Sequence, residues 1–361
     1  MRKFNYFLYE NFDTTKERDN QSNPRLFFNA KTDNILSNLK EPLKNYADYD
    51  YSYIKDLADI GIIKFKNDIL YAGCPIFYRE DAKTLLDNIQ PKAIILFKQL
   101  SKYMQQIRNS CSKIKNGFAV ETNLYHIICG MIFDGYFFDY LTNKKVLSTS
   151  HVHANGLDYI AVIYEQCKEL QDLSNNLLCS YNRISNTQCA LQSFGDANGT
   201  RFDFYKFFQT LHKTSNYEKF SYIINKYGEI DKNSFLSNVY ELIKSGNCSN
   251  VTKKLLDEFG YTDNGTFVVP VFLPEHTKTI FEIEDIIENA LGKLTADLLD
   301  ELSTTRALTP VKHDVTYLEI ANELYHILFG TVNEKLVTDG YVDTPPNING
   351  EGRYLKCIEV Y

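Results

Sequence analysis

Apolar and polar positions between residues 35 and 77 predict two helices followed by a hairpin. Apolar residues recur at three- and four-residue spacing from 35 to 43 and again from 53 to 60, where Gly61 follows as a helix-ending residue. Two β-prone runs then flank a polar turn at 66–68. The segment is therefore predicted as helix, turn, helix and hairpin.

A shortened version of this segment returns at residues 235–272. The matching positions are Leu36, Ser37, Asn38, Glu41 and Lys44 in the first copy and Leu236, Ser237, Asn238, Glu241 and Lys244 in the second. Asp263-Asn264-Gly265 is a strong tight-turn signal between the β-prone runs of the second copy. Both copies end in Pro-x-Phe, at Pro75 and Pro270. The chain is therefore interpreted as a tandem duplication.

The segments that follow each hairpin are also alike. Residues 92–115 and 281–305 are predicted as long helices whose apolar residues alternate three and four apart, which is typical of a helix that packs on one partner helix. A further helix follows in each copy, at 121–142 and 315–338. The economical interpretation is that the two long helices pack on each other in a monomeric pseudo-dimer. A homodimer would satisfy the same pattern.

These patterns predict a helix-rich α+β fold built from two tandem winged-helix-like repeats that form an intramolecular pseudo-dimer. The first repeat is expected at residues 1–165 and the second at 234–361. Residues 166–233 have no convincing duplicate and are interpreted as an inserted helical and β segment. If the protein binds a partner other than nucleic acid, this segment is where we expect that binding site.

Composition and cysteine spacing narrow the class of protein. The 361 residues are 44% apolar and 24% charged, which is ordinary for a folded globular chain of two or three domains. No apolar run approaches the ~20 residues that span a bilayer, so we expect a cytoplasmic protein with no membrane partner. The eight cysteines form no CxxC pair, and neither a metal site, a cofactor nor a disulfide framework is expected.

Charge is distributed unevenly along the chain. Residues 1–150 carry 21 basic and 17 acidic residues, whereas residues 151–361 carry 18 basic and 29 acidic residues. The net negative charge of the chain argues against indiscriminate binding of nucleic acid, but it does not exclude a local basic face on the first half.

The order of elements in 35–77 and 235–272 resembles the winged helix-turn-helix superfamily. The resemblance is generic and covers about 80 residues. Most members of that superfamily are DNA-binding transcription regulators, commonly dimers, in which the second helix enters the major groove and the wing touches phosphate. The resemblance implies that this chain is a single-chain transcription regulator that binds double-stranded DNA. The implied contacts are Asn250, Thr252, Lys253 and Lys254 in one copy and Lys55, Lys64 and Lys66 in the other.

Two alternatives to a DNA-binding regulator stay open. Asp48, Asp50, Asp56 and Asp59 surround the second helix of the first copy and repel phosphate, which favours a non-catalytic protein-interaction or scaffold protein. An enzyme is the second alternative. The sequence has no nucleophile elbow, phosphate loop or zinc-protease motif, so no residue is proposed as catalytic.

Histidines provide the remaining candidate chemistry. Leu-Tyr-His occurs at 124–126 and again at 324–326, so His126 and His326 form a possible pseudo-symmetric pair that could meet, bind a metal or respond to pH. The favoured interpretation is plainer: each packs inside its own domain and hydrogen-bonds a carbonyl. His151 and His153 alternate along an extended segment, and with no third ligand nearby they favour a polar loop over a metal site.

Overall fold

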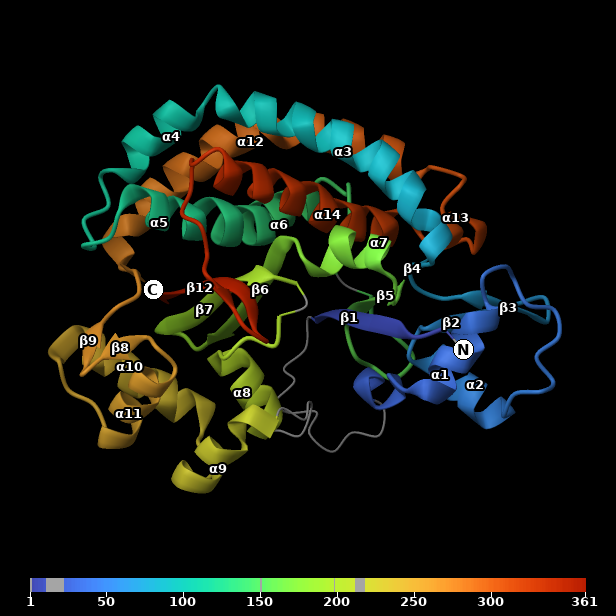
Figure 1. Cartoon of the computed structure of the whole chain (residues 1–361), viewed down its shortest axis with the longest axis horizontal. Coiled ribbons are helices and arrows are strands. Elements are labelled where there is room, and N and C mark those ends of the chain that lie inside the picture. Colours follow the sequence, from blue (N-terminus) through green and yellow to red (C-terminus); the bar gives the residue numbers. More distant parts are fainter. Residues whose placement is uncertain (1, 11–22, 150, 198, 212–217) are drawn as a thin grey trace. The chain divides into compact units, whose positions relative to one another are not determined.

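The computed structural model describes residues 2–10, 23–149, 151–197, 199–211 and 218–361. It is an α+β fold whose chain forms two compact units, each assembled from three separate stretches (Figure 1). Unit 1 comprises Met1–Leu96, Asp139–Asn176 and Gly292–Thr331. Unit 2 comprises Phe97–Phe138, Leu177–Leu291 and Val332–Tyr361.

A three-stranded sheet forms the centre of unit 1. Its strands, in spatial order, are β1 (Phe4–Glu10), β5 (Tyr159–Glu165) and β4 (Ile76–Phe77). Strand β1 runs antiparallel to β5 and β4 runs parallel to it. Ile163 of β5 is the shared register position, because it pairs with Tyr6 on one side and Ile76 on the other.

The first predicted helix, turn, helix and hairpin lies in unit 1. It consists of α1 (Ala30–Asn38), α2 (Tyr51–Asp59), β2 (Ile63–Lys66) and β3 (Ile69–Ala72). Asn29 begins α1 by accepting hydrogen bonds from the backbone of Lys31 and Thr32. Asn67 and Asp68 both have positive φ, as the tight turn between two twisted strands requires. We call α1, α2 and β2–β3 the first helix–hairpin segment.

Unit 1 also holds short helices and the parts of four other helices that fall within its stretches. Its short elements are η1 (Pro24–Phe27), α7 (Lys168–Leu170), η3 (Gln171–Asn175) and α13 (Thr309–Lys312). The longer elements that contribute to it are α3 (Arg79–Ser101), α6 (Phe137–Asn143), α12 (Pro274–Ser303) and α14 (Tyr317–Thr338).

Strand β5 is buried almost throughout because both faces of the sheet are covered. Tyr159, Ala161 and Ile163 pack in one core with buried residues of α1 and α2. On the opposite face, Tyr164 donates a hydrogen bond to Glu323 of α14. A helix from the carboxyl-terminal part of the chain therefore covers the sheet of the amino-terminal part.

Unit 2 has a sheet with the same topology. Its strands are β10 (Val271–Phe272), β12 (Gly352–Val360), β7 (Cys189–Asp196) and β6 (Leu178–Ser185), with β11 (Asn347–Ile348) paired to β12. Strand β10 is parallel and β7 antiparallel to β12, and Ile358 pairs with both Val271 and Leu191. The order and directions of β10–β12–β7 therefore match those of β4–β5–β1.

Helices cover both faces of the unit 2 sheet (Figure 1). The helices and the second hairpin are α4 (Met104–Cys111), α5 (Val120–Leu124), η2 (Tyr125–Tyr136), α8 (Phe204–Leu211), η4 (Glu218–Phe220), α9 (Ser221–Tyr227), α10 (Lys232–Ser245), α11 (Asn250–Glu258), β8 (Thr262–Asp263) and β9 (Thr266–Phe267). We call α10, α11 and β8–β9 the second helix–hairpin segment.

An aromatic core joins one face of this sheet to helices α8, α10 and α11. Phe204 is buried, and its ring lies 4.1 Å from the ring of Phe259 and 4.6 Å from that of Phe235. On the other face, the Tyr125 hydroxyl of η2 donates to the carbonyl of Phe194 over 3.0 Å. Strand β7 is buried along its whole length as a result.

The long predicted helices lie side by side within each unit. In unit 1, Lys92 of α3 forms an ion pair with Glu301 of α12 over 2.9 Å. In unit 2, the Gln99 side chain of α3 reaches the carbonyl of Ala290 in α12. The first long helix differs from the prediction of 92–115: α3 already begins at Arg79, contains Pro91, and is separated from α4 by a turn.

The compact units cut across the expected boundaries at 165 and 233. Residues 97–138 of the first repeat belong to unit 2, and residues 292–331 of the second repeat belong to unit 1. Residues 166–233, which the sequence predicts to have no duplicate, contain β7, and β7 occupies the same position in its sheet as β1 does in the sheet of unit 1. The sequences of β7 (CALQSFGD) and β1 (FNYFLYE) are both apolar but share no residue pattern, so sequence comparison does not show that the two strands correspond.

Candidate nucleic-acid interface

Hydrogen bonds define the turn between α10 and α11. Helix α10 ends at Gly246, whose φ of 75° is the left-handed conformation that suits glycine. Ser249 begins α11 by accepting from the Thr252 backbone N–H over 3.1 Å. The Ser249 backbone N–H in turn donates to the Asn238 side chain of α10. The start of α11 is therefore held directly against the preceding helix.

The candidate contacts of α11 differ in exposure. Asn250 and Lys254 are exposed, and Lys253 is half-buried. Thr252 is only 4% exposed, and its hydroxyl lies 2.8 Å from that of Ser249. We therefore correct the expectation for Thr252: its side chain completes the helix start and is not accessible to a phosphate or base.

Positive charge gathers at the amino-terminal end of α11. Within the described ranges, Lys253 and Lys254 form no ion pair. The acidic residues come later in the helix, where Glu258 pairs with Lys226 and accepts a hydrogen bond from the Tyr227 hydroxyl. The helix dipole adds partial positive charge at the same end as the two lysines. This end of α11 can therefore attract phosphate.

The second hairpin is tied to α11. Asn264 and Gly265 both have positive φ, which is the conformation of the predicted tight turn. The Asp257 carboxylate of α11 accepts from the Thr262 hydroxyl over 2.6 Å and from the Gly265 backbone N–H over 3.3 Å. The hairpin and the helix thus form one rigid element.

The surroundings of α2 in the first helix–hairpin segment are more acidic. Lys55 is exposed on α2, but so are Asp56 and Asp59 of the same helix. Hydrogen bonds from Ser52 and Lys31 lower the pKa of Asp50, at the start of α2, to about 2. Asp50 therefore stays ionised at the start of α2, where it forms an ion pair with Lys31 over 3.0 Å, whereas the start of α11 carries lysines.

The two lysines of the first hairpin are already engaged. The Lys66 ammonium forms an ion pair with Asp314 over 2.6 Å, and the Lys64 ammonium donates to the Asp314 carbonyl over 2.7 Å. Sequence reasoning missed Asp314, because 248 residues separate it from Lys66 along the chain.

His126 and His326 lie in different compact units. His326 is buried in unit 1, where its Nδ1 is 2.9 Å from the Asn322 carbonyl and its ring stacks 4.3 Å from that of Tyr9. His126 is buried in unit 2 and lies edge-on to Tyr125. The interpretation favoured from the sequence is that each histidine packs inside its own domain and hydrogen-bonds a carbonyl, and His326 makes such a contact.

Burial of His126 predicts a loss of stability in acid. Burial lowers its pKa to about 3, below the ordinary 6.5 that the unfolded chain has, so the unfolded state binds more protons between these values. The free energy of unfolding should therefore fall as the pH drops below 6.5, by roughly 2 kcal/mol at pH 5 from this residue. Urea titrations of the wild type and of His126→Leu, at pH 6.5 and at pH 5, would measure this change in the free energy of unfolding. An unchanged pH dependence in the variant would contradict the assignment.

A buried carboxyl group was not predicted from the sequence. Glu323 of α14 is 3% exposed and accepts hydrogen bonds from the hydroxyls of Tyr9 and Tyr164. Burial raises the pKa of Glu323. These contacts fasten α14 to β1 and β5, and no local pattern marks the residue.

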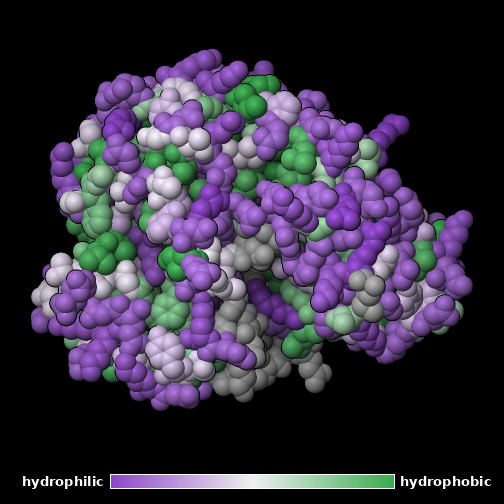
Figure 2. Space-filling model, viewed as in Figure 1, coloured by the Kyte–Doolittle hydropathy of each residue, from purple (hydrophilic) through white to green (hydrophobic). Residues whose placement is uncertain are grey.

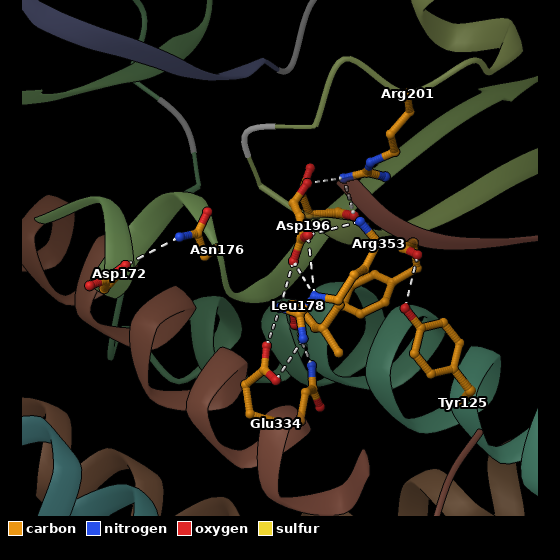
Figure 3. Close-up of polar contacts among 11 residues, drawn as sticks. Tyr125, Asp172, Asn176, Leu178, Asp196, Arg201, Glu334 and Arg353 are labelled. Carbon is orange, nitrogen blue, oxygen red and sulfur yellow. Dashed lines mark hydrogen bonds and ion pairs between the residues drawn. The ribbon is translucent and has the colours of Figure 1, made fainter. Parts of the chain in front are cut away.

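Unit 2 contains a partly buried network of charged residues (Figure 3). Arg353 of β12 forms ion pairs with Asp196 over 2.7 Å and with Glu334 over 2.6 Å. Arg201 is 1% exposed and donates to the carbonyls of Ser180, Ser193 and Asp196. These residues fix the loop after β7 to the sheet.

The remaining candidate chemistry does not converge on a site. His151 and His153 stack 4.5 Å apart, and His151 contacts Glu319 over 3.0 Å. Among the described residues, no group of three histidine, cysteine or acidic side chains is placed to hold a metal ion. A depression in unit 1, lined mainly by Leu85, Ile89 and Leu302, encloses about 0 Å³ that a water molecule could occupy, whereas ordinary ligand pockets enclose ~300 Å³ or more.

Within the described part of the chain, no helix combines the length and the apolar composition needed to cross a membrane. Comparisons with protein-family models, curated proteins and solved structures found no match to this chain.

Proposed function

We propose that this protein is a DNA-binding regulator that holds duplex DNA through the second helix–hairpin segment. The observation that carries the proposal is the start of α11, where Asn250 and Lys254 are exposed and Lys253 has no ion pair within the described residues. Helix α11 follows α10 after a short hydrogen-bonded turn and precedes a hairpin, which is the element order of winged helices.

The chemistry of α11 suits a recognition helix. Asn250 offers an amide that can pair with the edge of adenine, and Lys254 can donate to guanine. Lys253 and the helix amino terminus can contact phosphate. Val251 is 43% exposed on the same turn and can pack against a thymine methyl group.

The two sheets support a pseudo-dimer of tandem winged-helix-like repeats. They share strand order, strand direction and the paired positions of Ile163 and Ile358. Each unit also contains a helical stretch of the other repeat, 97–138 in one case and 292–331 in the other. A reciprocal exchange of this kind is the arrangement expected when two copies that once paired as separate chains become one chain.

Replacement of the two lysines of α11 tests the function. Lys253→Ala/Lys254→Ala should weaken binding to random-sequence duplex DNA at least about tenfold at low salt, and should reduce the salt dependence by about two ions. Fluorescence anisotropy across a salt series measures both quantities.

A matched control removes the same charge elsewhere in unit 2. Lys98→Ala/Lys278→Ala alters two exposed lysines of α3 and α12 and should change the affinity much less. Failure of the wild-type protein to bind duplex DNA even at low salt would remove the proposal. Equal losses in the two double variants would show that only net charge matters.

Contact with another protein is the second candidate function. Tyr51 is 66% exposed at the start of α2, next to the acidic residues of that helix, and this surface suits a protein better than phosphate. On the face shown in Figure 2, hydrophilic residues cover most of the surface and hydrophobic residues are scattered among them. The DNA titration above separates the two functions.

A further inference from the structure

The two helix–hairpin segments differ in whether their basic residues are paired with an acidic residue. Lys253 and Lys254 of the second segment form no ion pair within the described ranges, whereas both lysines of the first hairpin bind Asp314. The carboxylate and the carbonyl of one residue thus occupy ammonium groups that would otherwise meet two phosphate oxygens. This asymmetry bears on which segment is able to hold DNA.

Asp314 is held in place by the fold. It follows α13 with a φ of 54°, an uncommon conformation for a residue other than glycine. The preceding residue, His313, is fully buried, and its Nδ1 accepts from the Ala72 backbone N–H of β3 over 3.0 Å. Its Nε2 lies 3.3 Å from the Lys40 carbonyl. The corner between α13 and α14 is therefore anchored to the same hairpin whose lysines it engages.

Helix α13 is anchored from its other end as well. Asp81, only 2% exposed, accepts from the Thr309 backbone N–H over 2.8 Å and from the Thr309 hydroxyl over 3.1 Å. The same carboxylate accepts from the Tyr78 backbone N–H, at the start of α3. Asp314 is thus presented to the lysines by a corner with fixed contacts on both sides, and its ion pair with Lys66 lies at the surface, with the two side chains 57% and 56% exposed.

We propose that Asp314 is a built-in competitor for phosphate, which masks the first hairpin and leaves DNA binding to the second helix–hairpin segment. This inference rests on the proposed function and states how that function is restricted. Removal of the Asp314 charge should free Lys66 to contact the phosphate backbone, while Lys64 keeps its hydrogen bond to the Asp314 carbonyl. Affinity and salt dependence should therefore rise together.

The test compares Asp314→Asn with Glu41→Gln in the full chain. Asparagine tolerates positive φ as well as aspartate does, so the corner should keep its shape. Glu41 forms an exposed ion pair with Lys312 at the same corner, and its replacement makes the same change in net charge without touching the hairpin lysines. We expect Asp314→Asn to bind random duplex DNA about three- to tenfold more tightly at low salt, with a salt slope steeper by about one. Glu41→Gln should stay within about twofold of the wild type.

Two further variants make the test independent of any change in folding. Lys64→Gln/Lys66→Gln should leave the affinity of the wild type unchanged, because those lysines are already engaged, and should cancel the gain in the Asp314→Asn background. Equal affinities of Asp314→Asn and Glu41→Gln, or a loss in the wild-type background, would overturn the masking by Asp314 while DNA binding itself stands. Absence of binding in every variant and in the wild type would instead overturn the proposed function.

Discussion

Residues 1–176 and 177–361, produced separately, should each fail to fold, and should recover the native structure when they are produced together. The amino-terminal half lacks 292–331, which contains the part of α14 that covers β5 in unit 1. The carboxyl-terminal half lacks 97–138, which contains the η2 helix that covers β7 in unit 2. Each half therefore exposes one face of its sheet.

The expected loss is comparable with the stability of an ordinary domain. A buried aliphatic or aromatic side chain contributes roughly 1.5–3 kcal/mol, whereas a domain is stable by only about 5–15 kcal/mol. In unit 1 the uncovered residues would include Ile160, Val162 and Tyr164, all buried in the intact chain. Far-ultraviolet circular dichroism and urea titration of each half would measure the loss.

The matched control breaks the chain at the same position but keeps both halves in the sample. Cleavage at a protease site inserted after Asn176 in the full chain, where the two units change over, should leave a folded complex of two fragments. Cooperative unfolding of either half alone would contradict the reciprocal exchange of helices between the units.

Arg201→Ala should be strongly destabilising, by about 3–5 kcal/mol. The guanidinium is buried and donates to three backbone carbonyls and to the Ser193 hydroxyl over distances of 2.9–3.2 Å. Alanine would leave these acceptors without a partner in a site that water does not reach, and the loop that follows β7 would lose its attachment to the sheet (Figure 3). Urea denaturation of the variant and wild type measures the difference.

Arg79→Ala is the control for removal of an arginine. The Arg79 side chain is 62% exposed and pairs with Glu169 over 3.4 Å, so its loss should change the melting temperature little. Arg201→Lys should recover only part of the stability, because an ammonium cannot reproduce the fork of the guanidinium. Similar melting temperatures for Arg201→Ala and Arg79→Ala would show that the buried network contributes no net stability.

Local patterns predicted the order of elements in the helix–hairpin segments, because their signals lie within a few residues of one another, but α1 lies at Ala30–Asn38 and not at the predicted 35–43. Gly246, Ser249 and Gly265 have the backbone conformations or hydrogen bonds that end a helix, begin a helix and turn a hairpin. Sequence reasoning assigned Thr252 to the contact surface, but its side chain is buried and its hydroxyl contacts that of Ser249. Local signals could not reveal Asp314 either, which approaches its lysines only in the folded chain.

Pairing of the long helices explains part of the uneven distribution of charge along the chain. Residues 88–120 contain six basic and no acidic residues, whereas Pro274–Ser303 contains eight acidic and two basic residues. Lys92 pairs with Glu301 in unit 1, and Lys113 pairs with Glu282 in unit 2. Part of the uneven charge that suggested a basic face therefore serves the packing of helices on each other.

The sequence by itself determined the helices and hairpins of the two helix–hairpin segments, because the spacing of apolar residues, capping residues and turn residues act over one or two turns of chain. Only the tertiary structure decided which sheet each helix covers and which charges are neutralised. Helical stripes such as those of η2 and α14 can bury themselves against any matching apolar face, and two nearly equivalent sheets offered such a face. The choice between them depends on long-range contacts such as that of Glu323 with Tyr9 and Tyr164, which no local pattern encodes.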